Sequence, residues 1–186
     1  MLRVILAVFA AAPITGFASA WGAKYLDRTF AVKQADVGHF LWLPMVGFDL
    51  GAIVFGDLSS RQQRASGAPP RLLFGISALL GSCLVMLPLA TSPWMAIGIL
   101  ALAMSGAGGL YTLASSDVLG RVPRERVAFA SSMLAASQSF ILIIANPLIG
   151  MAVTHFESYS QAAIALAAWV IPGSVVWILW RPSVVR

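Results

Sequence analysis

Six apolar runs divide the chain, and each approaches the length of about 20 residues that a membrane-spanning helix needs. The runs cover approximately residues 4–22, 38–56, 72–90, 94–116, 127–153 and 160–180. Between them lie turn-forming or charged segments, at 27–36, 61–71, 91–93, 120–126 and 155–160. No period-2 alternation is long enough for the strands of a barrel. The pattern therefore predicts an all-α integral membrane fold with six transmembrane helices.

Composition supports a lipid environment. The 186 residues are 59% hydrophobic and 10% charged, whereas a soluble domain carries about 25% charged residues. Mean hydropathy is +0.86, so a soluble chain of this composition has too little polar surface to cover itself. The net charge is +5, but the basic residues cluster between apolar runs instead of along one face, which argues against a nucleic-acid partner.

The basic residues also predict the orientation. If the start of the first helix is inside, the inside segments hold nine arginines: Arg3, Arg61, Arg64, Arg71, Arg121, Arg124, Arg126, Arg181 and Arg186. The outside segments hold Lys24, Arg28 and Lys33. The positive-inside rule then places both termini in the cytoplasm of a multi-pass protein of a bacterial-type inner (plasma) membrane.

The first run has a second interpretation. A basic start, an apolar stretch and Ala18-Ser19-Ala20 are also typical of a signal peptide with its cleavage site. Cleavage there would leave five spans and an N-terminus outside.

Several short motifs follow one another along the chain. They are Pro13 with Trp21-Gly22-Ala23-Lys24-Tyr25-Leu26, Leu43-Pro44, Asp49-Leu50-Gly51, Gly56-Asp57-Leu58-Ser59-Ser60-Arg61, Ser116-Asp117-Val118, Pro123-Arg124-Glu125-Arg126-Val127-Ala128 and Asn146-Pro147-Leu148-Ile149-Gly150. Their order resembles helices 7–12 of the major facilitator superfamily, and within it the hexuronate-transporter-like members of the anion:cation symporter family. The resemblance makes residues 1–26 the first helix of a C-terminal half, which argues against cleavage after Ala20.

The resemblance implies one C-terminal transmembrane half-domain over residues 1–186, with the N-terminal half absent. A truncated or fragmentary gene product is the expected explanation. Such a half should fold poorly and should not transport alone. The family's inner loop after its eighth helix commonly reads G-G-x-L-S-D-R; here Phe55 replaces the first glycine and Ser60 occupies the aspartate position, so the charge pairing of that loop is expected to differ.

Three residues are candidates for binding substrate. Asn146 precedes Pro147, which cannot donate a backbone hydrogen bond and frees a carbonyl one turn back. Gln138 lies eight residues earlier, about two helical turns, and Tyr111 lies in the fourth span. Polar groups at mid-membrane are where transporters of this kind bind substrate. The alternatives are a capped kink for Asn146, and interhelical hydrogen bonds for Gln138 and the nearby serines.

Asp49 lies about halfway along the second span. An ionisable group at that depth costs about 2.5–3.5 kcal/mol on insertion scales. It should therefore face the bundle or water, either as a coupling carboxylate or as a structural one bonded to a neighbouring helix.

Two acidic residues have an arginine four positions later, near inner helix ends: Asp57 with Arg61 and Asp117 with Arg121. Within the resembling fold they are candidates for a cytoplasmic gate, and the alternative is plain helix-end pairing. Small residues at Ser105 and Gly109, and at Ala128, Ser132 and Ala136, predict close packing of the fourth and fifth spans.

Other residues have simpler expected roles. Lys24 should reach the headgroups. The tryptophans near span ends should anchor the membrane interface: Trp21, Trp42, Trp94, Trp177 and Trp180. The motifs G-x-S-x-G, H-E-x-x-H and the Walker loop do not occur, and Cys83 stands alone. No enzyme activity, cofactor or metal site is predicted.

The sequence thus favours secondary active transport of a small organic anion such as a hexuronate or other sugar acid, coupled to a cation or proton. The expected partners are the lipid bilayer, the anion, the co-transported cation, and the missing half or a second copy of the chain. The alternatives are a stand-alone six-helix half that dimerises and a non-transporting membrane interaction protein.

Overall fold

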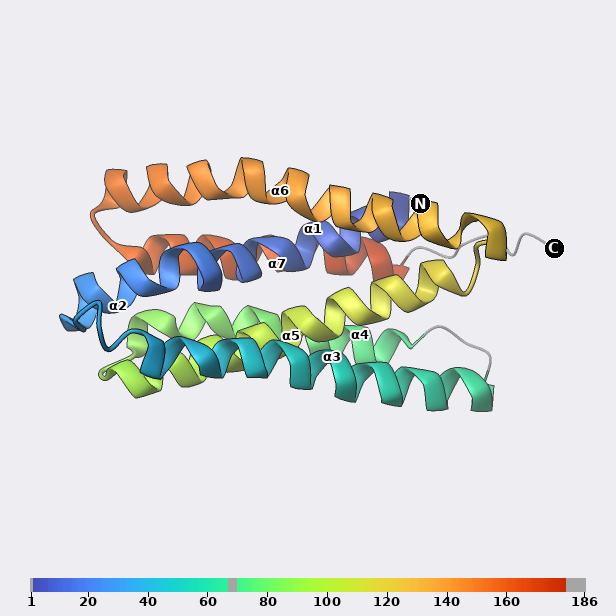
Figure 1. Cartoon of the computed structure of the whole chain (residues 1–186), viewed down its shortest axis with the longest axis horizontal. Helices are drawn as coiled ribbons and strands as arrows, with labels where there is room; N and C mark the ends of the chain where they lie inside the picture. The colour runs from blue at the N-terminus through green and yellow to red at the C-terminus, as the bar shows by residue number, and fades with distance from the viewer. Residues whose placement is uncertain (1, 67–69, 180–186) are drawn as a thin grey trace.

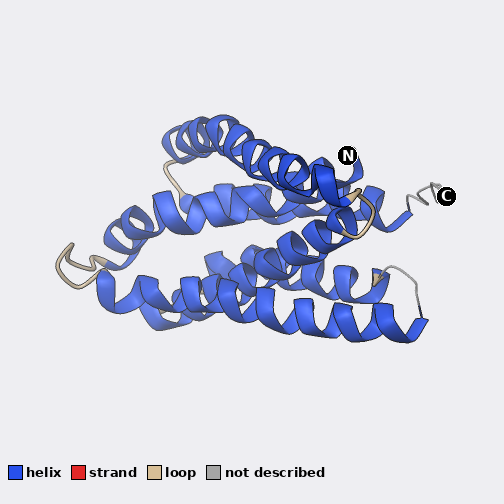
Figure 2. Cartoon of the chain, turned by 45° about the vertical axis from the view of Figure 1, so that its right-hand side comes forward, coloured by secondary structure: helices blue, strands red, loops and turns tan. Residues whose placement is uncertain are grey.

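A computed structural model describes residues 2–66 and 70–179, and these fold into helices joined by short loops (Figures 1 and 2). Met1, Gly67, Pro69, Trp180, Arg181 and Arg186 lie outside the described residues. The α-helices are α1 (Leu2–Gly16), α2 (Gly22–Phe30), α3 (Gly38–Ser66), α4 (Arg71–Ser82), α5 (Pro93–Leu119), α6 (Val127–Phe156) and α7 (Tyr159–Leu179). A π-helical turn (Phe17–Trp21) joins α1 to α2, and 3₁₀ segments follow α4 (Cys83–Leu89) and precede α6 (Arg124–Arg126).

Local chemistry explains several helix ends. The Ser92 hydroxyl accepts a hydrogen bond from the Met95 N–H at 3.2 Å, and Pro93 occupies the first turn of α5, where its missing N–H costs nothing. The left-handed residues Ala31 (φ 54°) and Glu157 (φ 51°) end α2 and α6. These ends fall within or beside the predicted polar breaks.

Five helical segments have the length and apolarity to cross a membrane: Gly38–Arg64, Arg71–Leu89, Pro93–Leu119, Arg124–Phe156 and Tyr159–Leu179. They contain nearly all of the second to sixth predicted spans. The first predicted span is not among them, because α1 ends at Gly16 and a π-helical turn follows. The helical path nevertheless runs without a break from Leu2 to Phe30, through Ala18-Ser19-Ala20.

The helices form two layers. Contacts run from α3 to α5, from α5 to α1 and from α1 to α6, so these four lie side by side in that order. The second layer is α4 and α7, which contact each other and cover α5 and α1 respectively. Figure 1 shows α3 and α6 at opposite edges of the bundle. The central position of α5 agrees with its burial: 67% of its apolar window is buried, against 17% for α3 and for the segment containing α6.

The two ends of the bundle differ in their loops. The turns 31–37, 90–92 and 157–158 lie at one end, and the start of α1 and the turn before α6 lie at the other (Figure 1). We call them the outer and inner ends, after the orientation predicted from the arginines.

Glycines bring α3 and α5 into backbone contact. A Cβ on Gly47 would lie 2.5 Å from the Ala101 carbonyl oxygen, and one on Gly51 would overlap the Ser105 carbonyl oxygen. Likewise, a Cβ on Gly108 would overlap the Phe48 carbonyl oxygen. The two helices run parallel, and Gly47 and Gly51 form a G-x-x-x-G pair, the spacing that allows close approach in membranes.

The predicted close packing of the fourth and fifth spans is therefore wrong. The fourth span, α5, packs mainly on α3 and α4 and only weakly on α6. The small residues Ala128, Ser132 and Ala136 on α6 are all exposed. Small residues indicate that something can approach closely, but they do not say which helix does so.

One predicted interface anchor is also wrong. Trp177 is fully buried, and its ring stacks on Phe74 of α4 with centroids 3.8 Å apart and planes 8° apart. Trp42 and Trp94 are exposed, as an interfacial role requires. Trp21 is half-buried and packs against Gly150 of α6.

Candidate substrate-binding face

Every predicted site residue lies on the four-helix layer. Asp49 is on α3, Tyr111 on α5, and Gln138 and Asn146 on α6. The covering helices α4 and α7 carry none of them. The structure therefore places residues up to 97 positions apart, Asp49 to Asn146, in one layer, although α1 separates α6 from α5 and α3.

Asn146 lies at the contact between α6 and α1. Its side-chain oxygen is buried without a hydrogen-bond partner among the described residues. A Cβ on Gly16 would lie 3.4 Å from this oxygen and 2.6 Å from a methyl of Leu142, so the glycine permits the contact. A buried, unsatisfied acceptor is costly, and it can be satisfied by a ligand group or by water.

The π-helical turn adjoins this contact. Such turns are rare and occur frequently at functional sites. Thr15 is half-buried and Ser19 is exposed, and their hydroxyls donate to backbone carbonyls of Ala12 (2.8 Å) and Thr15 (2.7 Å). Sequence analysis missed both hydroxyls: it considered Ser19 only as part of a possible cleavage site, and no motif pointed to Thr15.

Gln138 and Tyr111 are both half-buried. Ser137, beside Gln138, donates its hydroxyl to the Met133 carbonyl at 2.7 Å within α6, so this bond is intrahelical and not the interhelical bond given as the alternative. Tyr111 lies in the inner half of α5. Its backbone carbonyl accepts a hydrogen bond from the Ser115 hydroxyl at 2.7 Å. Both side chains stay candidates for a substrate contact.

Asp49 is exposed in the middle of α3. It is two residues from Gly51, a rotation of about 200° around the helix axis, so it points away from the α5 contact. Its neighbours Met45 and Ile53 are exposed and apolar. Because an aspartate facing lipid at this depth is costly, this side of α3 is expected to face water or another part of the protein.

Both predicted ion pairs form: Asp57 and Arg61 lie within α3, and Asp117 near the end of α5 pairs with Arg121 in the turn that follows. Arg61 Nε lies 2.9 Å from Asp57 Oδ2, with both side chains exposed (75% and 54%). Arg121 Nη2 lies 2.9 Å from Asp117 Oδ1, and Asp117 is only 7% exposed. The exposed pair is worth little, whereas the buried carboxylate of Asp117 depends on its partners.

Two further features concern charge. The Lys24 amine lies over the Trp21 ring, 4.8 Å from its centroid, a cation–π contact. Among the described residues, no group of three His, Cys, Asp or Glu side chains is placed to hold a metal ion.

The five long apolar helical segments define a multi-pass helical membrane protein. The chain is similar to the hexuronate transporters of Escherichia coli K12 and of Escherichia coli O157:H7, with 30% identity to each over 185 aligned residues. The alignment covers 94% of this chain and 41% of each relative, so the chain spans about two fifths of the length of the curated relatives it matches. No protein-family model matches the chain.

Proposed function

We propose that this chain is part of a secondary active transporter of an organic anion, such as a hexuronate or another sugar acid. The observation that carries the proposal is the 30% identity, along nearly the whole chain, to hexuronate transporters. The polar residues on the four-helix layer support it, because a transporter needs a polar site at mid-membrane depth between apolar helices.

The proposed architecture is a six-helix half of a major facilitator fold, corresponding to its helices 7–12. In it, the helical path from Leu2 to Phe30 contains the first span, which completes the six, and both termini lie in the cytoplasm. The second wall of the transport cavity comes from a further six helices or from a second copy of the chain. Asp49 supports a second wall, because its exposed position at mid-span requires a polar surrounding.

The proposed roles follow from the geometry. Asn146 binds the hydroxyls or the carboxylate of the sugar acid, since its buried oxygen lacks a partner in the described part of the chain. Gln138 and Tyr111 are further contacts, and Asp49 accepts the coupling proton or orients its path. Asp57 with Arg61 and Asp117 with Arg121 are proposed to close the cytoplasmic side by exchanging their partners.

The test is uptake of radiolabelled glucuronate by cells that lack their own hexuronate transporters and express the complete gene product containing this chain. We expect uptake above the empty-vector level. Asn146→Ala should reduce it about tenfold or more at equal membrane expression, because a hydrogen bond to a charged ligand contributes about 1.5–3 kcal/mol.

The matched control is Thr154→Ala, which removes an exposed hydroxyl bonded to the Gly150 carbonyl on the same helix and should leave uptake unchanged. Uptake equal to the vector level would refute the substrate class. Unchanged uptake in Asn146→Ala would refute the proposed site alone.

A further inference from the structure

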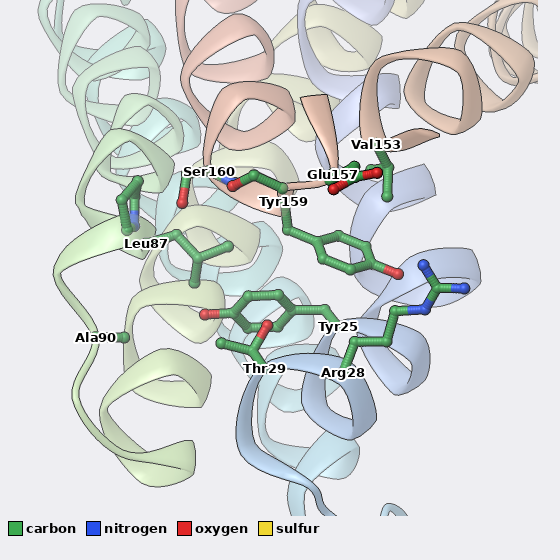
Figure 3. A pocket seen from close by; sticks show the side chains of 11 residues that line it. Tyr25, Arg28, Thr29, Leu87, Ala90, Val153, Glu157, Tyr159 and Ser160 are labelled. Carbon is green, nitrogen blue, oxygen red and sulfur yellow. The ribbon is translucent and has the colours of Figure 1, made fainter. Parts of the chain in front are cut away.

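A cavity of about 440 Å³ opens at the outer end of the bundle, and the transport proposal does not use it (Figure 3). Four separate segments form its wall: the second half of α2 from Tyr25, the end of the 3₁₀ segment after α4, the end of α6 and the start of α7. The residues that matter below are Tyr25, Arg28, Leu87, Val153, Glu157 and Tyr159. Its volume is in the range of small-molecule sites.

The cavity lies at headgroup depth. Three of the apolar segments have one end within a few residues of the cavity. Two of them end beside it, Arg71–Leu89 and Arg124–Phe156, and one begins beside it, Tyr159–Leu179. The hydrocarbon core stops where such segments stop, and the polar headgroup region follows. Tyrosines in its wall fit that depth, because their rings favour the membrane interface.

The cavity has a positive and a negative part. Arg28 lines it from α2, and Glu157 lines it from the end of α6, with no ion pair between these two side chains in the described structure. The start of α7, where the Ser158 hydroxyl accepts the Ser160 N–H at 3.1 Å, adds the positive end of a helix dipole, and the end of α6 adds a negative one.

Two tyrosines hold the wall in place. The Tyr25 and Tyr159 rings meet edge to face with centroids 5.6 Å apart, and Phe17 packs against both at 6.3 and 6.5 Å. Tyr25 is buried, and its phenolic O–H can donate a hydrogen bond. In Figure 3 the Tyr159 hydroxyl points to the same side as the Arg28 guanidinium, and the Tyr25 hydroxyl points the other way.

We propose that the outer cavity binds the zwitterionic headgroup of a phospholipid, of the phosphatidylethanolamine type. The phosphate binds Arg28, the start of α7 and a tyrosine hydroxyl, and the ammonium binds Glu157 and the end of α6. Leu87 and Val153 contact the glycerol and the first methylenes of the lipid. Among the residues that line the cavity, one arginine and one glutamate match a headgroup with one charge of each sign, whereas a purely anionic ligand would meet the Glu157 carboxylate.

The experiment is native mass spectrometry of the delipidated complete gene product that contains this chain, in detergent, with equal amounts of phosphatidylethanolamine and phosphatidylglycerol. We expect the zwitterionic lipid to be retained preferentially. Arg28→Gln should reduce its retention about tenfold, the loss expected for a charge-assisted bond to phosphate, and Arg28→Lys should retain it within about twofold. Glu157→Gln should abolish the preference over phosphatidylglycerol, because the carboxylate that repels anionic lipid is gone.

Two matched controls change charge at the same end without touching the cavity: Lys33→Gln for Arg28 and Asp36→Asn for Glu157. Both residues are exposed in the loop between α2 and α3, and both controls should bind as wild type. Soluble phosphoethanolamine carries the same charged groups without acyl chains and should not displace the lipid at equal concentration.

Three results would overturn the proposal. They are equal retention in Arg28→Gln and Lys33→Gln, an unchanged lipid preference in Glu157→Gln, and displacement of the lipid by phosphoethanolamine, which would make the ligand a soluble zwitterion. Melting temperatures of all variants, measured without lipid, separate a lost site from a lost fold.

Discussion

The two edge helices pack on the two central helices in the same direction but by different means. On one side, α3 runs parallel to α5, and Gly47, Gly51 and Gly108 bring the two backbones into contact. On the other side, α6 runs parallel to α1, and the contact passes through side chains: Leu142 and Asn146 against Gly16, and Trp21 against Gly150.

The difference has mechanical consequences. A backbone contact cannot yield without moving a whole helix, so α3 and α5 form a rigid pair. Side chains can change rotamer, so the contact between α1 and α6 can adjust, and the π-helical turn beside it adds a local irregularity. Asn146, the leading candidate for substrate binding, lies in the adjustable pair, and Asp49 lies on the rigid one. Four sets of variants would break or sharpen this contrast.

The largest effect is expected from Gly51→Ala, because the added methyl overlaps a backbone oxygen that cannot rotate away. Overpacking costs about 1–3 kcal/mol, and we expect the upper end of that range, seen as a marked fall in melting temperature and in folded yield from membranes. Gly98→Ala on α5 is the control, since nothing lies within 4 Å of a Cβ there. If the two variants have the same melting temperature, α3 and α5 are not a rigid pair.

A smaller effect is expected from Gly16→Ala. The new methyl meets the end of the Leu142 side chain, which can move, and approaches the Asn146 oxygen. We expect a loss of about 1 kcal/mol, the lower end for overpacking, measured by the same thermal assay. Transport should fall more than stability does, because Asn146 must shift. A destabilisation as large as that of Gly51→Ala would show that the α1–α6 contact does not adjust.

The ion pairs test the inner ends of the rigid pair. Asp117→Asn on α5 should cost about 1–2 kcal/mol, since it weakens charge-assisted bonds to Arg121 at a site only 7% exposed. Asp57→Asn on α3 should cost about 0.5 kcal/mol or less, because both partners are exposed. Denaturation of each variant, at low and at high salt, measures the difference. The reverse order would contradict the assignment of burial.

A small effect is also expected where α7 packs on α1. Trp169 donates its indole N–H to the Phe9 carbonyl at 3.0 Å and stacks on the Phe9 ring with centroids 4.8 Å apart. Trp169→Phe keeps the stacking and removes the donor, so we expect a loss of about 0.6 kcal/mol, the average for an interhelical hydrogen bond in membranes. Trp169→Ala should cost several times more in the same assay, and equal losses would assign the effect to the hydrogen bond alone.

Local sequence determined much of this protein. Runs of apolar residues predicted the second to sixth spans, because the cost of burying charge in lipid depends on each segment alone. The start of α5 at Ser92 and Pro93 could also be predicted, and so could the two ion pairs, because each depends only on residues within four positions of one another.

Only the tertiary structure decided which faces meet. Apolar side chains on a membrane helix are equally suited to lipid and to protein, so hydropathy did not distinguish the buried Trp177 from the exposed Trp94. Sequence analysis also could not predict which helix packs on the α5 glycines, the π-helical turn at Phe17–Trp21 or the outer cavity. They arise from contacts between residues far apart in the chain, such as Tyr25 and Tyr159, and no local pattern encodes that pairing.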